Sequence, residues 1–192
     1  MGRFIVVFLV SAVISGFGIG YWRIATMPET ILNASMKTAT SVSAIDEQTI
    51  RAPVNQLAHS AGAYTADMDV AQIGVTAPMA DMLYSVIWLD VSDEPMIVSV
   101  PDFGDRYYSI SFTDIRNLNT GYIGTRVTGN GAGVYAVVSP DWNGELPDGV
   151  KRFEINTPKA QAMVRVFMAG ADDFEDSDAV RRLITFTPMS QF

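Results

Sequence analysis

The single histidine, His59, is the first residue whose chemistry would suit a hydrolase. In a Ser-His-Asp arrangement the imidazole takes the proton of the serine hydroxyl, and the aspartate orients the ring. Ser85 and Asp67 could complete such a triad, but no serine lies in a Gly-x-Ser-x-Gly elbow. We therefore interpret His59 as a packing or surface residue and predict no catalytic residue.

A glycine-rich stretch, Gly129-Asn-Gly-Ala-Gly133, has the composition of a phosphate-binding loop. A P-loop also needs Gly-Lys-Ser or Gly-Lys-Thr, and a dinucleotide fingerprint needs a helix directly after its glycines. Here the following residues have strand character. The stretch is therefore predicted to be a hairpin turn with positive φ angles, and no cofactor is expected.

Two acidic stretches carry enough oxygen atoms to raise the question of a metal site. Asp141-Trp-Asn-Gly-Glu145 offers oxygens at alternate positions, and Asp172–Asp178 contains five carboxylates. The first lacks the twelve-residue spacing of a calcium loop, and the second is typical of a solvated helix entry. We predict no metal site, with a calcium ion near Asp141 as the open alternative.

A third set combines aspartate, tyrosine and arginine side chains at strand ends and turns. Arginine pairs with carboxylates, which can belong to the protein or to a ligand. We interpret the set mainly as internal ion pairs that position loops, with a polar ligand site as the alternative. Its members are Asp81, Tyr84, Asp102, Arg106, Tyr107, Tyr108, Asp114 and Arg126.

Short strands must position these side chains. Period-two alternation places Tyr108, Ile110 and Phe112 on one face of a strand, and turn signals separate the successive runs. Six short strands with such turns predict an antiparallel β-sandwich. A short helix is predicted from Asp176 or Ser177 to about Ile184. The expected strands are 82–91, 96–100, 106–113, 134–139, 150–155 and 162–168.

The amino terminus has a different character. Phe4 to Trp22 is an uncharged run between Arg3 and Arg23, and as a helix it measures about 28 Å, close to the bilayer core. Residues 1–25 are therefore predicted to be a transmembrane signal anchor. The alternative is a cleaved signal, although a cut after Ala25 would place Arg23 at an unfavourable position.

Small residues recur every fourth position in this run, at Ala12, Gly16 and Gly20, a spacing that lets membrane helices pack closely. Residues 26–52 are expected to form a juxtamembrane tether or short helix, with Asp46 capping a segment from Glu47.

The totals narrow the class of protein further. The chain has 192 residues, which suits one domain plus an appendage, and 48% hydrophobic residues, which supports a core. Its net charge of -8 argues against nucleic-acid binding. The absence of cysteine excludes disulfides and thiolate chemistry.

Several stretches appear together in a specific order. They are Asp81-Met-Leu-Tyr-Ser, Trp88-Leu-Asp90, Val100-Pro-Asp, Arg106-Tyr-Tyr-Ser, Gly124-Thr-Arg, Thr128-Gly-Asn-Gly-Ala-Gly133, Pro140-Asp-Trp-Asn-Gly144, Ala171-Asp-Asp-Phe, Ala179-Val-Arg and Thr187-Pro. In this order they resemble the bacterial family called domain of unknown function 1254. Family members often have Asn and Thr where this chain has Met79 and Met82, which removes any polar role there.

The resemblance implies an immunoglobulin-like β-sandwich with short helices over residues 53–192. Longer relatives continue into a second domain, of the 1214 type, and this chain is similar to short, anchored members whose second domain is a separate protein. The family has no established catalytic residues.

The first hypothesis is a membrane-tethered, extracytoplasmic sandwich without catalytic activity that binds a protein partner. The partner would be a 1214-type domain or an envelope complex. The expected location is the bacterial inner membrane, with a single pass and the domain in the periplasm. The alternatives are a hydrolase-like enzyme or a small-ligand or carbohydrate-binding module with an Asp/Arg/Tyr cleft.

Overall fold

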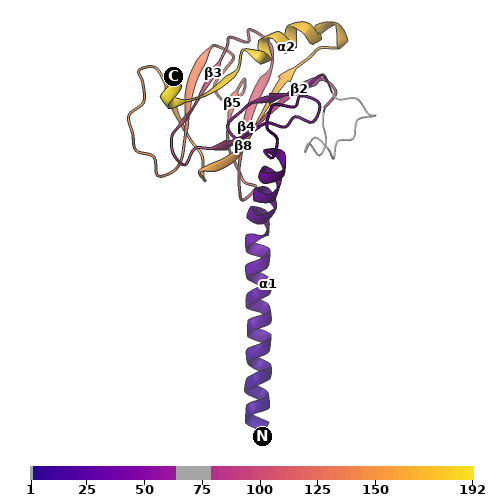
Figure 1. The fold of residues 1–192 in the computed structure, drawn as a ribbon, viewed down its shortest axis with the longest axis vertical. Helices are drawn as coiled ribbons and strands as arrows, with labels where there is room; N and C mark the ends of the chain where they lie inside the picture. Colours follow the sequence, from indigo (N-terminus) through magenta and orange to yellow (C-terminus); the bar gives the residue numbers. More distant parts are fainter. Residues whose placement is uncertain (1, 64–78) are drawn as a thin grey trace.

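The computed structural model of the chain describes residues 2–63 and 79–192, and within the first helix it describes side chains from Gly18 onward. In these ranges two β-sheets pack face to face and a long helix projects from them (Figure 1). The five-stranded sheet has the order β1-β2-β8-β4-β5, and the four-stranded sheet has the order β7-β6-β3-β9. The strands are β1 Ala58–His59, β2 Met82–Asp90, β3 Met96–Val100, β4 Tyr108–Asp114, β5 Asn119–Gly124, β6 Gly133–Val138, β7 Lys151–Glu154, β8 Lys159–Phe167 and β9 Thr185–Pro188.

The prediction of a mainly β chain with few helices is confirmed, but not all of its strands are antiparallel. Strand β7 runs parallel to β6, with Tyr135 opposite Lys151. A parallel pair needs a crossover rather than a tight turn. The connection from Ser139 to Val150 provides this crossover and contains the Asn-Gly and Asp-Gly turn signals.

The core lies between the sheets, and the predicted faces of β4 are confirmed. Tyr108, Ile110 and Phe112 have no exposed surface and belong to the main core cluster, whereas Ser109 and Ser111 occupy the opposite face. The ring of Phe112 lies 4.5 Å from that of Phe153 in the other sheet. Alternation with a period of two therefore decided the register of this strand correctly.

Strand β2 is buried on both faces, as its continuous apolar sequence predicts. Ile87 and Leu89 point into the main core. On the other face, Tyr84 and Trp88 belong to a second cluster that includes Met36 of the long helix. The end of the helix thus packs against part of the outer face of the five-stranded sheet.

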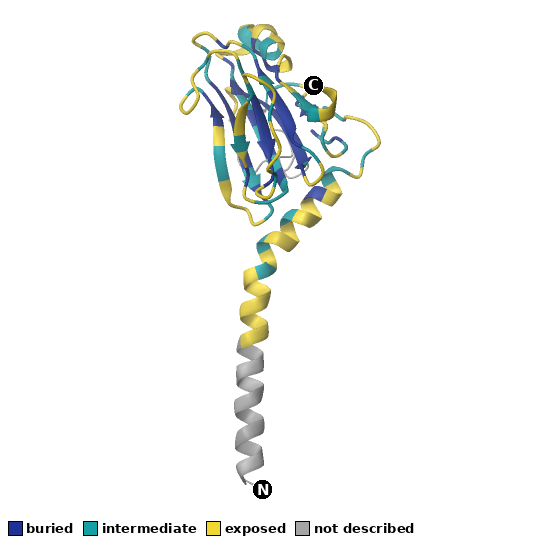
Figure 2. Ribbon diagram, turned by 90° about the vertical axis from the view of Figure 1, so that its left-hand side faces the viewer, coloured by how far each residue is buried: buried dark blue, intermediate teal, exposed yellow. Residues whose placement is uncertain are grey.

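The long helix, α1, runs from Gly2 to Ala39 and includes Pro28. Figure 2 shows it extending well beyond the sandwich and bending before it meets the sheet. Among the described residues, no helix combines the length and apolarity needed to cross a membrane. For residues 2–17, which include most of the predicted anchor with Ala12 and Gly16, the structure describes the helical backbone but not the side chains. Open space surrounds Gly20.

After α1 the chain forms turns, so the helix predicted to begin at Glu47 is wrong. The carboxylate of Asp46 accepts hydrogen bonds from the Gln48 N–H and the Thr49 hydroxyl, at 2.9 and 2.6 Å. Aspartate thus stabilises a tight turn here instead of a helix start. The predicted carboxyl-terminal helix is present as α2, Phe174–Arg182, after a single 3₁₀ turn over Ala171–Asp173.

Candidate functional site

One pocket on the outer face of the five-stranded sheet unites several predicted polar residues. Its volume is about 470 Å³. Asp81, Tyr84, Tyr107 and Arg126 line it, all of them predicted as members of a possible polar site. The remaining lining residues are Met79, Met82, Arg165 and Phe167.

Strand pairing places the tyrosines and one arginine in this pocket. Tyr84 of β2 lies opposite Arg165 of β8 in the antiparallel register. The N–H of Phe167, at the end of β8, donates to the carbonyl of Tyr107 at 2.9 Å, which brings Tyr107 alongside. Residues two apart share a face of a strand, so Arg165 and Phe167 both point to the outer side.

Arg126 reaches the pocket from the turn that follows β5. This turn begins at Gly124, whose φ is +151°, and a Cβ atom there would lie 2.5 Å from the carbonyl oxygen of Tyr108. Only glycine fits both the backbone angle and this close approach. The Val127 and Thr128 N–H groups then donate to the Gly124 carbonyl, each at 2.9 Å, and close the turn.

Both arginines of the pocket lie against aromatic rings. The Cζ atom of Arg126 is 5.9 Å from the centre of the Tyr107 ring, and that of Arg165 is 6.0 Å from the centre of the Tyr84 ring. These are cation–π distances. The Tyr84 hydroxyl accepts a hydrogen bond of 2.8 Å from the N–H of Met79, which fixes the ring at the wall of the pocket.

Arg106 does not line the pocket but forms an internal ion pair, as we interpreted it. Its guanidinium binds both carboxylate oxygens of Asp173, at 2.5 and 2.8 Å, and donates to the Ser177 hydroxyl and the Phe167 carbonyl. The Arg106 guanidinium and the Ala169 N–H hold the pKa of Asp173 far below its ordinary value. This pair ties the start of α2 to the end of β8.

The other three predicted residues stabilise local structure. Asp102 accepts from the Gly104 N–H at 2.8 Å in a tight turn. Asp114 is completely buried and binds Arg116. Tyr108 lies in the core, where burial raises its pKa, and its hydroxyl donates to the Gly129 carbonyl at 3.2 Å.

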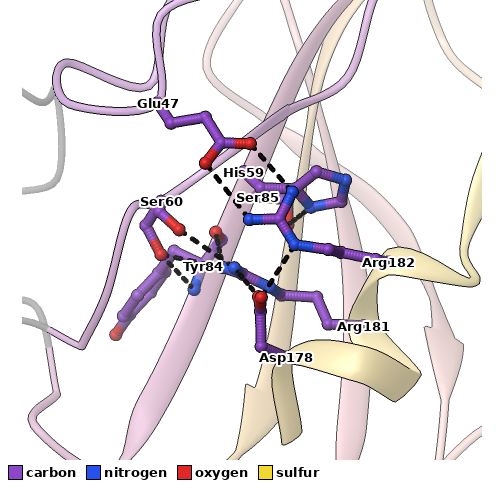
Figure 3. A network of polar contacts seen from close by, with 8 residues as sticks. All are labelled: Glu47, His59, Ser60, Tyr84, Ser85, Asp178, Arg181 and Arg182. Atoms are coloured by element: carbon purple, nitrogen blue, oxygen red, sulfur yellow. Dashed lines mark hydrogen bonds and ion pairs between the residues drawn. The ribbon is translucent and has the colours of Figure 1, made fainter. Parts of the chain in front are cut away.

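A second polar network, which sequence reasoning missed, joins α2 to β1 and β2 (Figure 3). The Arg181 side chain is completely buried. It donates to the hydroxyl and carbonyl of Ser60 at 2.8 and 2.9 Å, to the carbonyl of Tyr84, and to the carboxylate of Asp178. The sequence showed only a basic pair at a helix end, and nothing in that pattern indicates burial.

The neighbouring Arg182 forms the exposed half of the same network. It binds both carboxylate oxygens of Glu47, at 2.8 and 3.1 Å, and one oxygen of Asp178 at 2.7 Å. The bonds to these two carboxylates raise the pKa of Arg182, whose charge therefore persists at any ordinary pH. The turn after α1 is in this way fixed to α2.

His59 and Ser85 do meet, at the edge of this network. The His59 Nδ1 atom lies 2.8 Å from the Ser85 hydroxyl oxygen. Ser85 has no exposed surface, so no substrate carbonyl can reach its hydroxyl. Burial, followed by the charges of Arg181 and Arg182, lowers the pKa of His59 to about 4. Asp67, the third residue of the proposed triad, lies outside the described residues.

The remaining stretches with possible chemistry have structural roles. Gly129 has a φ of +82°, as the predicted turn requires. The predicted hairpin is wrong, because this stretch connects β5 of one sheet to β6 of the other. Trp142 packs against a small cluster on the outer face of the four-stranded sheet, and the Arg152 guanidinium lies 5.4 Å from its ring centre. Within residues 2–63 and 79–192, no three metal-binding side chains of His, Cys, Asp or Glu gather in one place.

These features define a mainly β, two-layered domain with an arginine- and tyrosine-lined pocket and one buried arginine network. The chain belongs to the family described as "Protein of unknown function (DUF1254)", which matches residues 54–188. This match confirms the family resemblance seen in the motifs. No curated protein matches the sequence.

Two solved structures are similar to this chain. The VPA0106 protein from Vibrio parahaemolyticus is 26% identical, with a TM-score of 0.57, and the match covers 60% of this chain and 29% of that one. An uncharacterized protein from Burkholderia cenocepacia is 10% identical, with a TM-score of 0.42, over 71% of this chain and 36% of that one. The chain thus matches about a third of the length of each.

Proposed function

We propose that this protein is a non-catalytic binding module, anchored by its amino-terminal helix in the inner membrane of a bacterium with the sandwich in the periplasm. The observation that carries the proposal is the surface of α1. Between Ile19 and Trp22 this helix exposes large apolar side chains, with Ile19 62%, Tyr21 77% and Trp22 63% exposed. Exposure of apolar side chains to water is unfavourable, and full burial of a large one contributes about 1.5 to 3 kcal/mol of free energy.

A lipid bilayer is the occupant that fits this surface best. The exposed apolar side chains continue the uncharged run that begins at Phe4. Tyr21 and Trp22 stand where an interfacial aromatic belt is expected, next to Arg23. Arg3 lies at the other end of the run, on the side that this proposal assigns to the cytoplasm.

The absence of a catalytic role is supported by His59. A general base works best with a pKa near the operating pH, and this histidine has a pKa of about 4. Its partner Ser85 is sealed from solvent. We therefore expect His59→Ala to leave the cellular role intact whenever the variant accumulates normally.

Membrane fractionation of the full chain tests the anchor. The protein should remain in the pellet after an alkaline carbonate wash. A Val10→Lys/Val13→Lys variant should leave the pellet, because each lysine at the bilayer centre costs about 3 kcal/mol. Thr30→Lys, outside the apolar run, is the matched control and should behave like the wild type. Release of the wild type into the supernatant would refute the anchor.

Protease accessibility tests the orientation separately. Protease added to spheroplasts should digest the sandwich, and full protection would mean that the domain faces the cytoplasm.

We also propose a protein partner, most simply a 1214-type domain anchored in the same membrane. The support comes from β5, which is the last strand at one edge of the five-stranded sheet in the described part of the chain, since an edge strand can pair with a strand of another protein. Leu118, Tyr122 and Val127, in or beside this strand, expose 43 to 65% of their surface. A sheet edge with exposed apolar side chains favours association.

A photoreactive amino acid in place of Tyr122 tests this surface at native expression level. It should crosslink to a protein that mass spectrometry identifies as carrying a 1214-type domain. The same amino acid at Leu183, an exposed residue at the end of α2, should give no such product, because α2 binds Ser60 beside β1 at the opposite edge of the sheet. Equal crosslinking at both sites, or none at Tyr122, would contradict the proposal.

A further inference from the structure

The two arginines of the pocket differ from those that hold the fold together. Arg106, Arg181 and Arg182 each bind a carboxylate. Among the described residues, Arg126 and Arg165 form no ion pair and contact aromatic rings instead. A ring face orients a guanidinium without satisfying its N–H donors, so both groups retain donors for a ligand.

The pocket has the size and the walls of a small-molecule site. Its volume of about 470 Å³ falls in the usual range for ligands, roughly 300 to 1,000 Å³. Met79, Met82 and Phe167 supply apolar surface beside the arginines. Guanidinium groups bind planar oxyanions through two parallel hydrogen bonds, so the chemistry points to an anion with an apolar body.

The charge of the pocket narrows the choice of anion. Arg126 and Arg165 contribute two positive charges and Asp81 one negative charge, which leaves a formal charge of +1. A monoanion balances this charge, whereas a phosphate dianion would meet the Asp81 carboxylate uncompensated. The chain as a whole carries -8, which further disfavours multiply charged anions.

We propose that this pocket binds a small monocarboxylate with an aromatic or aliphatic body. The inference deepens the proposed binding function, because it assigns a ligand class to the sandwich, and it does not depend on the membrane anchor. Arg165, held on Tyr84, and Arg126, held on Tyr107, receive the carboxylate. The methionines and Phe167 contact the apolar body.

Ligand-observed NMR titration of the detergent-solubilised full chain tests the proposal, with benzoate, phenyl phosphate and benzylammonium as probes. Benzoate should bind saturably and more tightly than phenyl phosphate, and benzylammonium should not bind. Arg126→Gln and Arg165→Gln should each weaken benzoate binding by about tenfold or more, the usual effect of losing a charge-assisted hydrogen bond.

Arg152→Gln is the matched control, because Arg152 also lies over an aromatic ring but on the opposite sheet. It should leave benzoate affinity unchanged. Arg126 is exposed in a turn, so its variant tests the pocket without threatening the core, and thermal unfolding without ligand verifies this. No saturable benzoate binding, wild-type benzoate affinity in both pocket variants, or tighter binding of phenyl phosphate would each overturn the proposal. The titration uses detergent-solubilised protein, so its outcome does not depend on the membrane anchor. A failure to bind benzoate would therefore leave the membrane fractionation as a separate test of the anchor.

Discussion

Arg181 donates a hydrogen bond of 2.6 Å to the backbone carbonyl of Tyr84, although 97 residues separate the two in sequence. The bond connects α2 to β2, the strand whose Tyr84 ring lines the pocket. A completely buried arginine is therefore bonded to the backbone of the strand whose Tyr84 ring forms one wall of the candidate site.

Replacing Arg181 should destabilise the domain strongly. In Arg181→Met the Ser60 carbonyl and hydroxyl lose Arg181 as a donor inside the protein. Asp178 and the Tyr84 carbonyl each lose one of their donors and keep another, the Arg182 guanidinium and the Ser60 N–H respectively. Breaking a buried pair in this way costs about 3 to 5 kcal/mol. Urea unfolding measures the change. Arg182→Met, which breaks the more exposed bonds to Glu47, should cost about 1 kcal/mol or less. Equal losses would show that burial does not determine the effect.

Replacing Arg106 should loosen α2 without unfolding the sheets. Arg106→Gln removes the two bonds to Asp173 and those to Ser177 and Phe167. Amide hydrogen exchange within Phe174–Arg182 should accelerate by about tenfold or more, whereas exchange in β4 and β8 should change little. Arg152→Gln, which removes an exposed pair with Glu154, should alter neither region. Uniform acceleration throughout the domain would contradict a local role for Arg106.

Stability should fall as the pH is lowered from about 6.5 to 4, because of His59. Its pKa is lowered from 6.5 to about 4 in the folded state, so the unfolded chain binds a proton first. The folded state is therefore favoured most above pH 6.5, and about 2 to 3 kcal/mol is lost by pH 4. Unfolding curves at several pH values measure this slope. His59→Gln should flatten it within this window, and an unchanged slope would assign the effect to other groups.

Placing a carboxylate at Phe112 should prevent folding. The Phe112 ring has no exposed surface and packs on Phe153 of the other sheet. An unpaired charge between the sheets costs several kcal/mol, comparable with the whole stability of a domain. Circular dichroism of Phe112→Asp should show loss of the native fold. Thr113→Asp, on the opposite and half-buried face, is the control and should remain folded.

The sequence predicted best where one physical rule dominated. In β4 the alternation of apolar side chains decides the face, so Phe112 was placed correctly, and in β2 the continuous apolar sequence predicted a strand that is buried on both faces. Strand β5 was missed because its Asn-Thr-Gly-Tyr-Ile-Gly sequence lies at a sheet edge, where neither alternation nor continuous apolarity is required. Strand β9 includes Pro188, which only an edge tolerates.

The candidate site was predicted in part for a related reason. Asp81, Tyr84, Tyr107 and Arg126 were recognised by residue type, and they line one pocket. Arg165 was missed because only the pairing of β2 with β8 brings it beside Tyr84, and pairing between distant strands leaves little trace in one sequence. The pairing of Arg106 with a carboxylate of the protein was expected from the chemistry of arginine. Its partner, Asp173, could be identified only from the folded structure.

The length of α1 sets the distance between the proposed membrane surface and the sandwich. With Trp22 at the lipid surface, the seventeen residues to Ala39 rise by about 25 Å. In the proposed anchored arrangement this length of helix would hold the sandwich away from the lipid headgroups. A proposed partner in the same membrane would then need a stalk of comparable length to reach it.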